Sequence, residues 1–480
     1  MPVPAFLYSV KRGLPVIDRR HFLAASTAAL VAGCTARTGI ASGTAPDLMS
    51  DVQERAFRFF WDTTDAATGL APDRWPTPSF ASIAAVGFAL TAYGVGEKHG
   101  WITREQHRAR TLATLEFFAK APSGPAASGT SGHKGFFYHF LDAKTGTRFG
   151  RTELSTIDTS LLLGGVLFAQ SWFDRADPQE ARIRDLAEQL YRAVEWDWIV
   201  PRPPFVSMGW HPESGFIRSD WDTYNEGMIL YVLALASPTH PLPPATWGAL
   251  TRKFERSWGN RWGDPHLQFA PMFGHQYSHV WVDFRGIRDP YIASKGIDYF
   301  ENSRRATYAQ RAYANENPGD KVGYGDDCWG LTACDGPGDF TVTIDGKPRE
   351  FFSYSARGPG ERDDGTLAPT AALGSIAFAP EIVTPMIEKM HTRYGAGIYA
   401  KYGFLDSFNP TLTRTDRPLQ HGRIVPGVGW VDGDYLGIDQ GPIVLMIENQ
   451  RSGMIWEVMR RNPHIRRGLE RAGFSGGWLE

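Results

Sequence analysis

Uncharged segments of helical length recur along the chain and alternate with helical segments that carry charge on one face. The segments that are apolar on every side are residues 81–92, 159–169, 228–236 and 443–447. Those with charge on one face are residues 104–120, 179–194, 245–257 and 381–394. A helix that is apolar all round is buried, whereas an amphipathic helix covers a core, so the alternation predicts two concentric layers of helices.

Twelve windows have helical patterning, enough for six inner and six outer helices. They are residues 47–62, 79–98, 104–120, 155–173, 179–196, 224–236, 245–257, 300–315, 369–378, 381–394, 440–451 and 453–460. The prediction is an all-α fold, an (α/α)6 toroid with long decorated loops and small β-hairpins. The alternative is an open α-solenoid, but the chain has no repeated motif and carries long loops at 258–299 and 315–369.

Two segments predict hairpins that project from the loops. Residues 339–360 alternate apolar and polar side chains around Asp345-Gly346, a pair that favours a tight turn. Residues 135–149 predict the second hairpin, with Lys144-Thr145-Gly146 as its turn. Loops on a rigid scaffold are where binding and catalytic groups tend to lie.

The first 34 residues have the pattern of an export signal. Arg19-Arg20 precedes a short apolar run that ends in "LVAGC", a Tat-type address followed by a lipobox with Cys34 as the lipidated residue. The run has about 12 residues, too few to span a bilayer, which needs roughly 20. We therefore expect a signal over 1–34, a linker over 35–46, and one catalytic domain over 47–480. The mature chain is expected to be a monomer in the periplasm or outer membrane, attached to the membrane only through its lipid anchor.

The charge balance, Lys+Arg 50 against Asp+Glu 52, gives no basic surface for nucleic acid. If Cys34 is lipidated, Cys328 and Cys334 remain, and an oxidising compartment would permit a disulfide between them. A metal site there is disfavoured because no histidine lies nearby in the sequence. The chain also lacks a G-x-S-x-G motif and a glycine-rich phosphate loop, and no cofactor is expected.

Acidic residues collect at four loop-to-helix junctions. The four groups are Glu153 with Asp158, Asp222 with Glu226, Asp298 with Glu301, and Asp432 with Asp434 and Asp439. In a double ring the inner helices present the same ends to one face, so we expect these carboxyl groups to converge on one cleft. Paired carboxyl groups suit glycosidic hydrolysis, because one donates a proton to the leaving oxygen while the other activates water or attacks.

Glu226 is the best candidate for the acid. It lies at the start of an apolar helix that we expect to be capped by Asp222 or Thr223, and its aromatic surroundings favour the protonated form. The alternative is a capping-box carboxylate that binds a backbone N–H. Asp439 or Asp434, on a glycine-rich loop open to water, suits the base.

The segment 270–289 is dense in side chains that bind and stack on sugars. Its candidate contacts are His275, Gln276, Tyr277, His279, Trp281 and Arg285. A metal site at His275 and His279, four positions apart, is disfavoured because Gly274 and the aromatic alternation argue against a helix there. The other predicted substrate contacts are Trp221, Tyr224, Glu301 and Trp329.

Six ordered motifs resemble the glycoamylase-like family of bacterial β-1,2-glucanases, glycoside hydrolase family 144. They are "ELSTIDTSLLLGG", "YNEGMILYVLALASPTHP", "FGHQYSHVWVDFRGIRD", "NSRRATYAQRAYA", "CWGLTACDGP" and "YLGIDQGPIVLMIEN". The resemblance implies an (α/α)6 barrel that hydrolyses β-1,2-glucan with inversion and releases sophorose or short sophorooligosaccharides. It implies Glu226 as the general acid, Glu153 and Asp158 in the substrate cleft, and Asp439, with Asp434 second, as the base.

Other functions stay open at this point. Members of such a family could act on other β-glucans, or as transglycosylases on cyclic β-1,2-glucans. Helical toroids also host polysaccharide lyases, for which Tyr277, His279 and Arg285 would supply the base and the countercharge. A third alternative is an inert glycan-binding lipoprotein.

Overall fold

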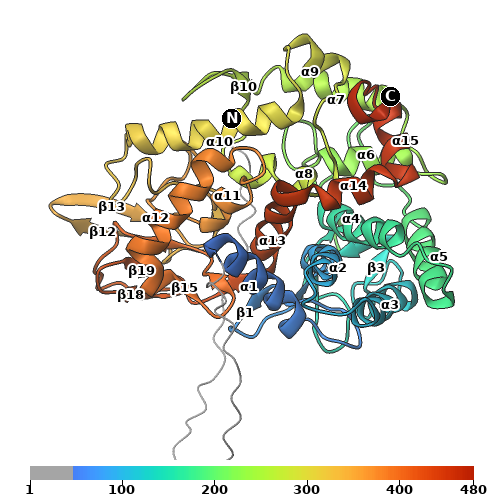
Figure 1. The fold of residues 1–480 in the computed structure, drawn as a ribbon, viewed down its shortest axis with the longest axis horizontal. Coiled ribbons are helices and arrows are strands. Elements are labelled where there is room, and N and C mark those ends of the chain that lie inside the picture. The colour runs from blue at the N-terminus through green and yellow to red at the C-terminus, as the bar shows by residue number, and fades with distance from the viewer. Residues whose placement is uncertain (1–46) are drawn as a thin grey trace, which may run out of the picture.

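The computed structural model describes residues 47–480, so the predicted signal and linker, with Cys34, lie outside the described residues. Within that range the chain alternates between outer and inner helices around one ring (Figure 1). The outer helices are α1 (Leu48–Thr63), α3 (Arg104–Lys120), α5 (Pro178–Arg192), α7 (Ala245–Phe254), α10 (Tyr299–Glu316) and α12 (Pro380–Ile398). The inner helices are α2 (Ile83–Lys98), α4 (Thr156–Trp172), α6 (Met228–Ala236), α8 (Tyr277–Trp281), α11 (Pro369–Leu373) and α13 (Gly437–Ser452). The predicted (α/α)6 toroid is confirmed.

The ring closes where its first and last helices meet. α13 lies near the centre of the view in Figure 1 and packs against both α1 and α2. Gln53 of α1 donates to the carbonyl of Val444 at 3.3 Å and to Glu448 at 3.0 Å. Arg451 donates back to Gln53 at 2.7 Å. These bonds join segments at opposite ends of the domain.

The inner helices α2 and α4 touch backbone to backbone. A Cβ atom at Gly87 would lie 2.2 Å from the carbonyl oxygen of Leu161, and one at Gly165 would lie 2.1 Å from the carbonyl oxygen of Gly87. Only glycine permits such an approach, which explains why uncharged, small residues are frequent in these buried helices.

Three helices depart from the sequence prediction. α8 lies in the segment 270–289 that was expected to be irregular, with the 3₁₀ turn η1 (Met272–His275) before it, because five buried side chains stabilise one short turn of helix. α14 (Met454–Arg460) was counted in the ring but packs against α4 and α8 outside the six pairs. α6 begins at Met228, not at Tyr224: its N-cap is Gly227, while Asp222 pairs with Lys253 and Thr223 contacts Ser257.

The remaining helices are α9 (Pro290–Ser294), α15 (Pro463–Arg471) and the 3₁₀ turn η2 (Gly477–Leu479). A search of the described residues for a helix with the length and apolarity of a membrane span found none.

Short strands tie the loops to the starts of the inner helices. β2 (Ala81–Ser82), β6 (Leu154–Ser155) and β20 (Tyr435–Leu436) each run directly into an inner helix. β2 pairs with β5 (Phe140–Leu141), and β20 pairs with β1 (Arg74–Trp75). β6 is the middle strand of a five-stranded sheet with β3 (Gly132–His133), β4 (Phe136–Tyr138), β7 (Gly209–His211) and β8 (Gly215–Phe216). The pairings fix where these helices start.

Both predicted hairpins are present. β12 (Phe340–Ile344) pairs with β13 (Lys347–Phe351) around Asp345 and Gly346, whose φ angles of 50° and 77° suit a tight hairpin turn. The chain also folds back around residues 144–146, with a bridge between Leu141 and Arg148. The other strands are β9 (Trp258–Gly259), β10 (His266–Leu267), β11 (Ala333–Cys334), β14 (Ser355–Ala356), β15 (Tyr399–Ala400), β16 (Gly403–Phe404), β17 (Phe408–Asn409), β18 (Arg423–Val425) and β19 (Gly429–Val431).

The disulfide that the sequence permitted between Cys328 and Cys334 is not formed. Both are buried free thiols. Cys328 closes a turn with Gly325, whereas Cys334 lies in β11 with its sulfur 3.5 Å from an Nη1 of Arg357, so the two belong to separate local structures.

Candidate active site

Carboxyl groups from three inner-helix junctions gather around Tyr277. The pKa of the Tyr277 hydroxyl is raised well above its usual range by burial and by the nearby charges of Asp439, Glu226 and Asp158. Those three acids precede or begin α13, α6 and α4. The predicted convergence of acids at one face of the ring is therefore correct for three of the four junctions.

The fourth junction faces elsewhere. Asp298 caps α10, and Glu301 pairs with Arg305 at 2.9 Å on the surface of that helix. α10 is an outer helix. Outer helices run back along the ring and start at the opposite end from the inner ones, so Glu301, predicted to contact substrate, lies outside the cleft.

Glu226 lies in the turn before α6 and does not cap it. The N-cap of α6 has no side-chain hydrogen bond, so Glu226 is not part of a capping box, although its carboxylate accepts a hydrogen bond from its own backbone N–H. Ser278 donates to the Glu226 carbonyl at 2.7 Å, while the carboxyl oxygen Oε2 is buried with no donor among the described residues. Burial, with the Asp158 charge in addition, raises the pKa of Glu226 to about 7. The side chain keeps partial exposure, so it can reach a ligand and still hold a proton near neutrality.

Asp439 lies in the first turn of α13 and is 4% exposed. Burial raises its pKa to about 7, although a hydrogen bond with Asp406 lowers it. Asp406 and Asp439 thus form a contact between two carboxyl groups deep in the site.

Asp434, the second candidate base, is held by other groups. Thr77 N–H donates to it at 3.0 Å, and Arg74 lies 3.7 Å away. The same arginine pairs with Asp335 at 2.6 Å and with Asp73 at 3.3 Å. These contacts bind Asp434 to Arg74 and Thr77, so Asp439 is the better placed of the two candidates for the base.

Asp335, Asp432 and Asp434 carry oxygens within 4.8 Å of one another, a spacing that could hold a cation. Arg74 already pairs with two of the three, so its guanidinium supplies the countercharge. The structure therefore gives no reason to place a metal among them.

Glu153 and Asp158 share one histidine that the sequence analysis did not single out. His139 contacts Glu153 at 2.8 Å through Nδ1 and Asp158 at 3.5 Å through Nε2. Burial opposes its charge, but the two carboxylates raise the pKa of His139 to about 9. Burial is likewise outweighed at Glu153, where His139 holds the pKa at about 2. Glu153 is therefore ionised at neutral pH and is not a proton donor.

Most side chains that the sequence offered as sugar contacts belong to the core. Tyr224 binds His275 at 3.0 Å, and His279 binds Ser303 at 3.0 Å. Burial lowers the pKa of both histidines to about 3, so they are neutral. These predictions are corrected because polar side chains in this segment satisfy buried partners of the inner ring. The buried set is Tyr224, His275, Gln276, His279, Trp281 and Trp329.

Two further predicted contacts, Trp221 and Arg285, have distinct places. Trp221 donates to Thr156 at 2.8 Å and packs beside Gly227, next to the acid turn. Arg285 pairs with Asp283 at 2.8 Å and covers the ring of Trp456, while His279 is buried and bound to Ser303. The lyase constellation of Tyr277, His279 and Arg285 is therefore not assembled.

Comparison with known proteins identifies this architecture. A family model described as glycoamylase, putative glucoamylase, matches residues 218–463. A putative glucoamylase from Bacteroides uniformis is 31% identical, with a TM-score of 0.75, and covers 90% of this chain and 98% of its own. The chain belongs to the glycoamylase-like family. The resemblance seen in the six motifs is confirmed.

Two relatives of this glycoamylase-like chain carry more specific names. An endo-β-1,2-glucanase from Chitinophaga pinensis, solved with sophorotriose and glucose, is 28% identical with a TM-score of 0.74, covering 90% of this chain and 99% of its own. An exo β-1,2-glucooligosaccharide sophorohydrolase from Parabacteroides distasonis is 29% identical over 457 residues, 88% of this chain. The chain spans 57% of the length of that curated relative.

The glycoamylase-like cleft also has parts that the sequence analysis missed. Tyr354 is 45% exposed, yet its hydroxyl end faces Asp439 and Asp406. Arg74 and Asp406 come from loops whose spacing carries no motif, and their role depends on contacts between distant segments.

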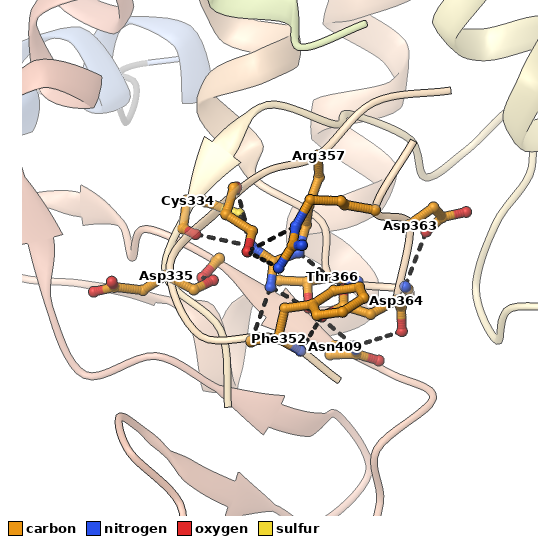
Figure 2. A network of polar contacts seen from close by, with 12 residues as sticks. Cys334, Asp335, Phe352, Arg357, Asp363, Asp364, Thr366 and Asn409 are labelled. Atoms are coloured by element: carbon orange, nitrogen blue, oxygen red, sulfur yellow. Dashed lines mark hydrogen bonds and ion pairs between the residues drawn. The ribbon is translucent and has the colours of Figure 1, made fainter. Parts of the chain in front are cut away.

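A buried arginine holds the loop that carries Tyr354 (Figure 2). Arg357 and Asp364 are both fully buried and pair at 2.9 Å. Arg357 also donates to the carbonyls of Phe352, at 3.1 Å, and Cys334, at 2.8 Å. The Arg357 side chain therefore links the 352–357 loop to β11, which leads directly into Asp335.

Proposed function

We propose that the chain is an exported, lipid-anchored glycoside hydrolase that cleaves β-1,2-glucan with inversion and releases sophorose or short sophorooligosaccharides. The names of the relatives from Chitinophaga pinensis and Parabacteroides distasonis support the substrate. The observation that carries the proposal is that two acids lie near Tyr277: Glu226, whose buried Oε2 has no donor among the described residues, and the buried Asp439.

In this proposal Glu226 gives its proton to the glycosidic oxygen as the bond breaks. Asp439 takes a proton from a water that attacks the anomeric carbon from the opposite face, so the configuration inverts. The two carboxyl groups of inverting enzymes lie about 6.5–9.5 Å apart, which leaves room for that water. The charged pair of His139 and Glu153 and the face of Tyr354 supply polar and aromatic contacts for the sugar.

The test is hydrolysis of linear β-1,2-glucan by the wild type and by Glu226→Gln. The amide cannot donate the acid proton, so we expect kcat to fall about 10²- to 10⁴-fold. The matched control is Glu301→Gln on the surface of α10, which should keep wild-type activity. Proton NMR of the first product gives the anomeric configuration.

Two results would reject the assignment: no sophorose-type product from the wild type, or undiminished activity in Glu226→Gln. Longer products joined to an acceptor would indicate a transglycosylase. Binding of the glucan by calorimetry without turnover would indicate the inert glycan-binding protein. Activity on another β-glucan alone would support a glycoside hydrolase but would assign it a different glycosidic linkage.

A further inference from the structure

The contact between Asp406 and Asp439 brings two buried acids together where one of them must hold a proton. Asp406 is 2% exposed and Asp439 is 4% exposed. Two ionised carboxylates repel each other at hydrogen-bond distance, and burial strengthens that repulsion. A hydrogen bond between them requires that one is the neutral acid.

The surroundings of Asp406 determine which oxygen carries that proton. Its Oδ2 accepts the backbone N–H of Asp335 at 2.7 Å and the hydroxyl of Ser407 at 3.2 Å. Its Oδ1 is buried and receives no donor among the described residues. An oxygen that already accepts two donors is the carbonyl oxygen of a carboxylic acid, so the proton belongs on Oδ1, the oxygen free to meet Asp439.

We propose that Asp406 is a positioning residue that stays protonated, donates its O–H to Asp439, and keeps Asp439 ionised as the base of the reaction. This inference rests on the proposed function, since it assigns Asp439 the role of base. It adds a residue that makes no contact with the reacting atoms and acts through its neighbour.

The charges around the pair favour this arrangement. Arg74 is the cation among them, so a further negative charge on Asp406 would be poorly compensated. The pKa of Asp406 is raised well above its ordinary value of 3.8, first by burial and then by Asp439. The groups that face the pair are Asp73, Arg74, Tyr277, Cys334, Asp335, Tyr354 and Asp432.

The test compares Asp406→Asn with Asp406→Leu in the pH profile of kcat/KM. The amide oxygen of asparagine can accept the Asp335 and Ser407 donors, which turns its NH₂ toward Asp439 and replaces the donated O–H. We expect Asp406→Asn to retain most activity and the wild-type acidic limb. Asp406→Leu removes the donor, so Asp439 should ionise at higher pH and the acidic limb should rise by about one to two pH units.

The matched control is Asp289→Asn, a buried aspartate that binds Trp247 and Tyr299 away from the cleft, and it should leave the pH profile unchanged. An unchanged acidic limb in Asp406→Leu would overturn the inference. So would loss of activity in Asp406→Asn as severe as in Asp439→Asn, which would make Asp406 itself the base.

A stability measurement separates this inference from the proposed function. In the unfolded state Asp406 loses its proton above about pH 3.8, whereas in the folded state it keeps that proton to higher pH. The free energy of unfolding of the wild type should therefore fall as the pH rises from about 3.8 toward the pKa of Asp406 in the folded state. Asp406→Asn has no such proton, so its melting temperature should fall less over the same range. If the melting temperatures of the wild type and Asp406→Asn fell equally with pH, Asp406 would not keep its proton in the folded state. That result would hold whether or not β-1,2-glucan is a substrate.

Discussion

At the scale of single residues, two carboxyl groups with raised pKa values have different neighbours. Glu226 has one buried oxygen without a donor among the described residues, and burial raises its pKa although a hydrogen bond from its own backbone N–H lowers it. Asp439 has the Asp406 carboxyl as a partner and Arg74 among its surroundings, both of which favour ionisation. Burial raises the pKa of both groups to about 7, so near neutral pH one can hold a proton while the other accepts one, as an acid and a base must.

The pH dependence of activity follows from these two groups. Both have a pKa of about 7, so kcat/KM should be bell-shaped with a narrow maximum near neutrality. Below that pH Asp439 is protonated and cannot accept a proton, and above it Glu226 is ionised and cannot donate one. In Glu226→Gln the residual activity should lose the alkaline limb and keep the acidic one. An alkaline limb that survives this substitution would assign it to another group.

At the scale of elements, the contact between α2 and α4 depends on glycine. Gly165→Ala would place a methyl group 2.1 Å from the Gly87 carbonyl oxygen, and backbone on both sides prevents relief. We expect a loss of about 1–3 kcal/mol or more in the free energy of unfolding, measured by urea denaturation. The control is Gly248→Ala in the outer helix α7, where the nearest atom is Arg252 Nη1 at 3.7 Å.

Gly248→Ala should be neutral or stabilise the protein by up to about 1 kcal/mol, because alanine favours helix more than glycine does. Equal effects of the two substitutions would mean that the α2–α4 contact is looser than the structure has it.

The long helices could be predicted from the sequence, because an inner helix is apolar on every side and an outer helix on one, and neither pattern needs knowledge of distant segments. The sequence also predicted Glu226, Asp158 and Asp439 at one face, since inner helices share an orientation. The sequence analysis misplaced the aromatic and histidine contacts, because residue type alone does not tell whether a side chain such as His279 or Trp281 lies in the core or in the cleft. It missed His139, Arg74 and Asp406, whose roles depend on partners brought close only by the fold.

At the scale of the whole molecule, the proposed export predicts that a lipid on Cys34 attaches the protein to the membrane. The wild type should sediment with membranes after export and be released by detergent, whereas Cys34→Ser should lose its anchor and stay in the soluble fraction. Cys328→Ser is the control, since that thiol is buried within the ring and should not affect attachment. Membrane attachment that persists in Cys34→Ser would contradict a lipid anchor at this position.

The meeting of α1 with α13 bears on when the enzyme becomes competent during its synthesis. Gln53 and Val444, which are hydrogen-bonded where these two helices meet, are 391 positions apart in the sequence. The ribosome therefore completes α1 long before it synthesises α13. The nascent chain must expose apolar helices to solvent for most of translation, and such exposed surface favours aggregation. Asp439 belongs to the same late helix, so the substrate groove and the contact between α1 and α13 are completed together, and a prematurely terminated product should lack both.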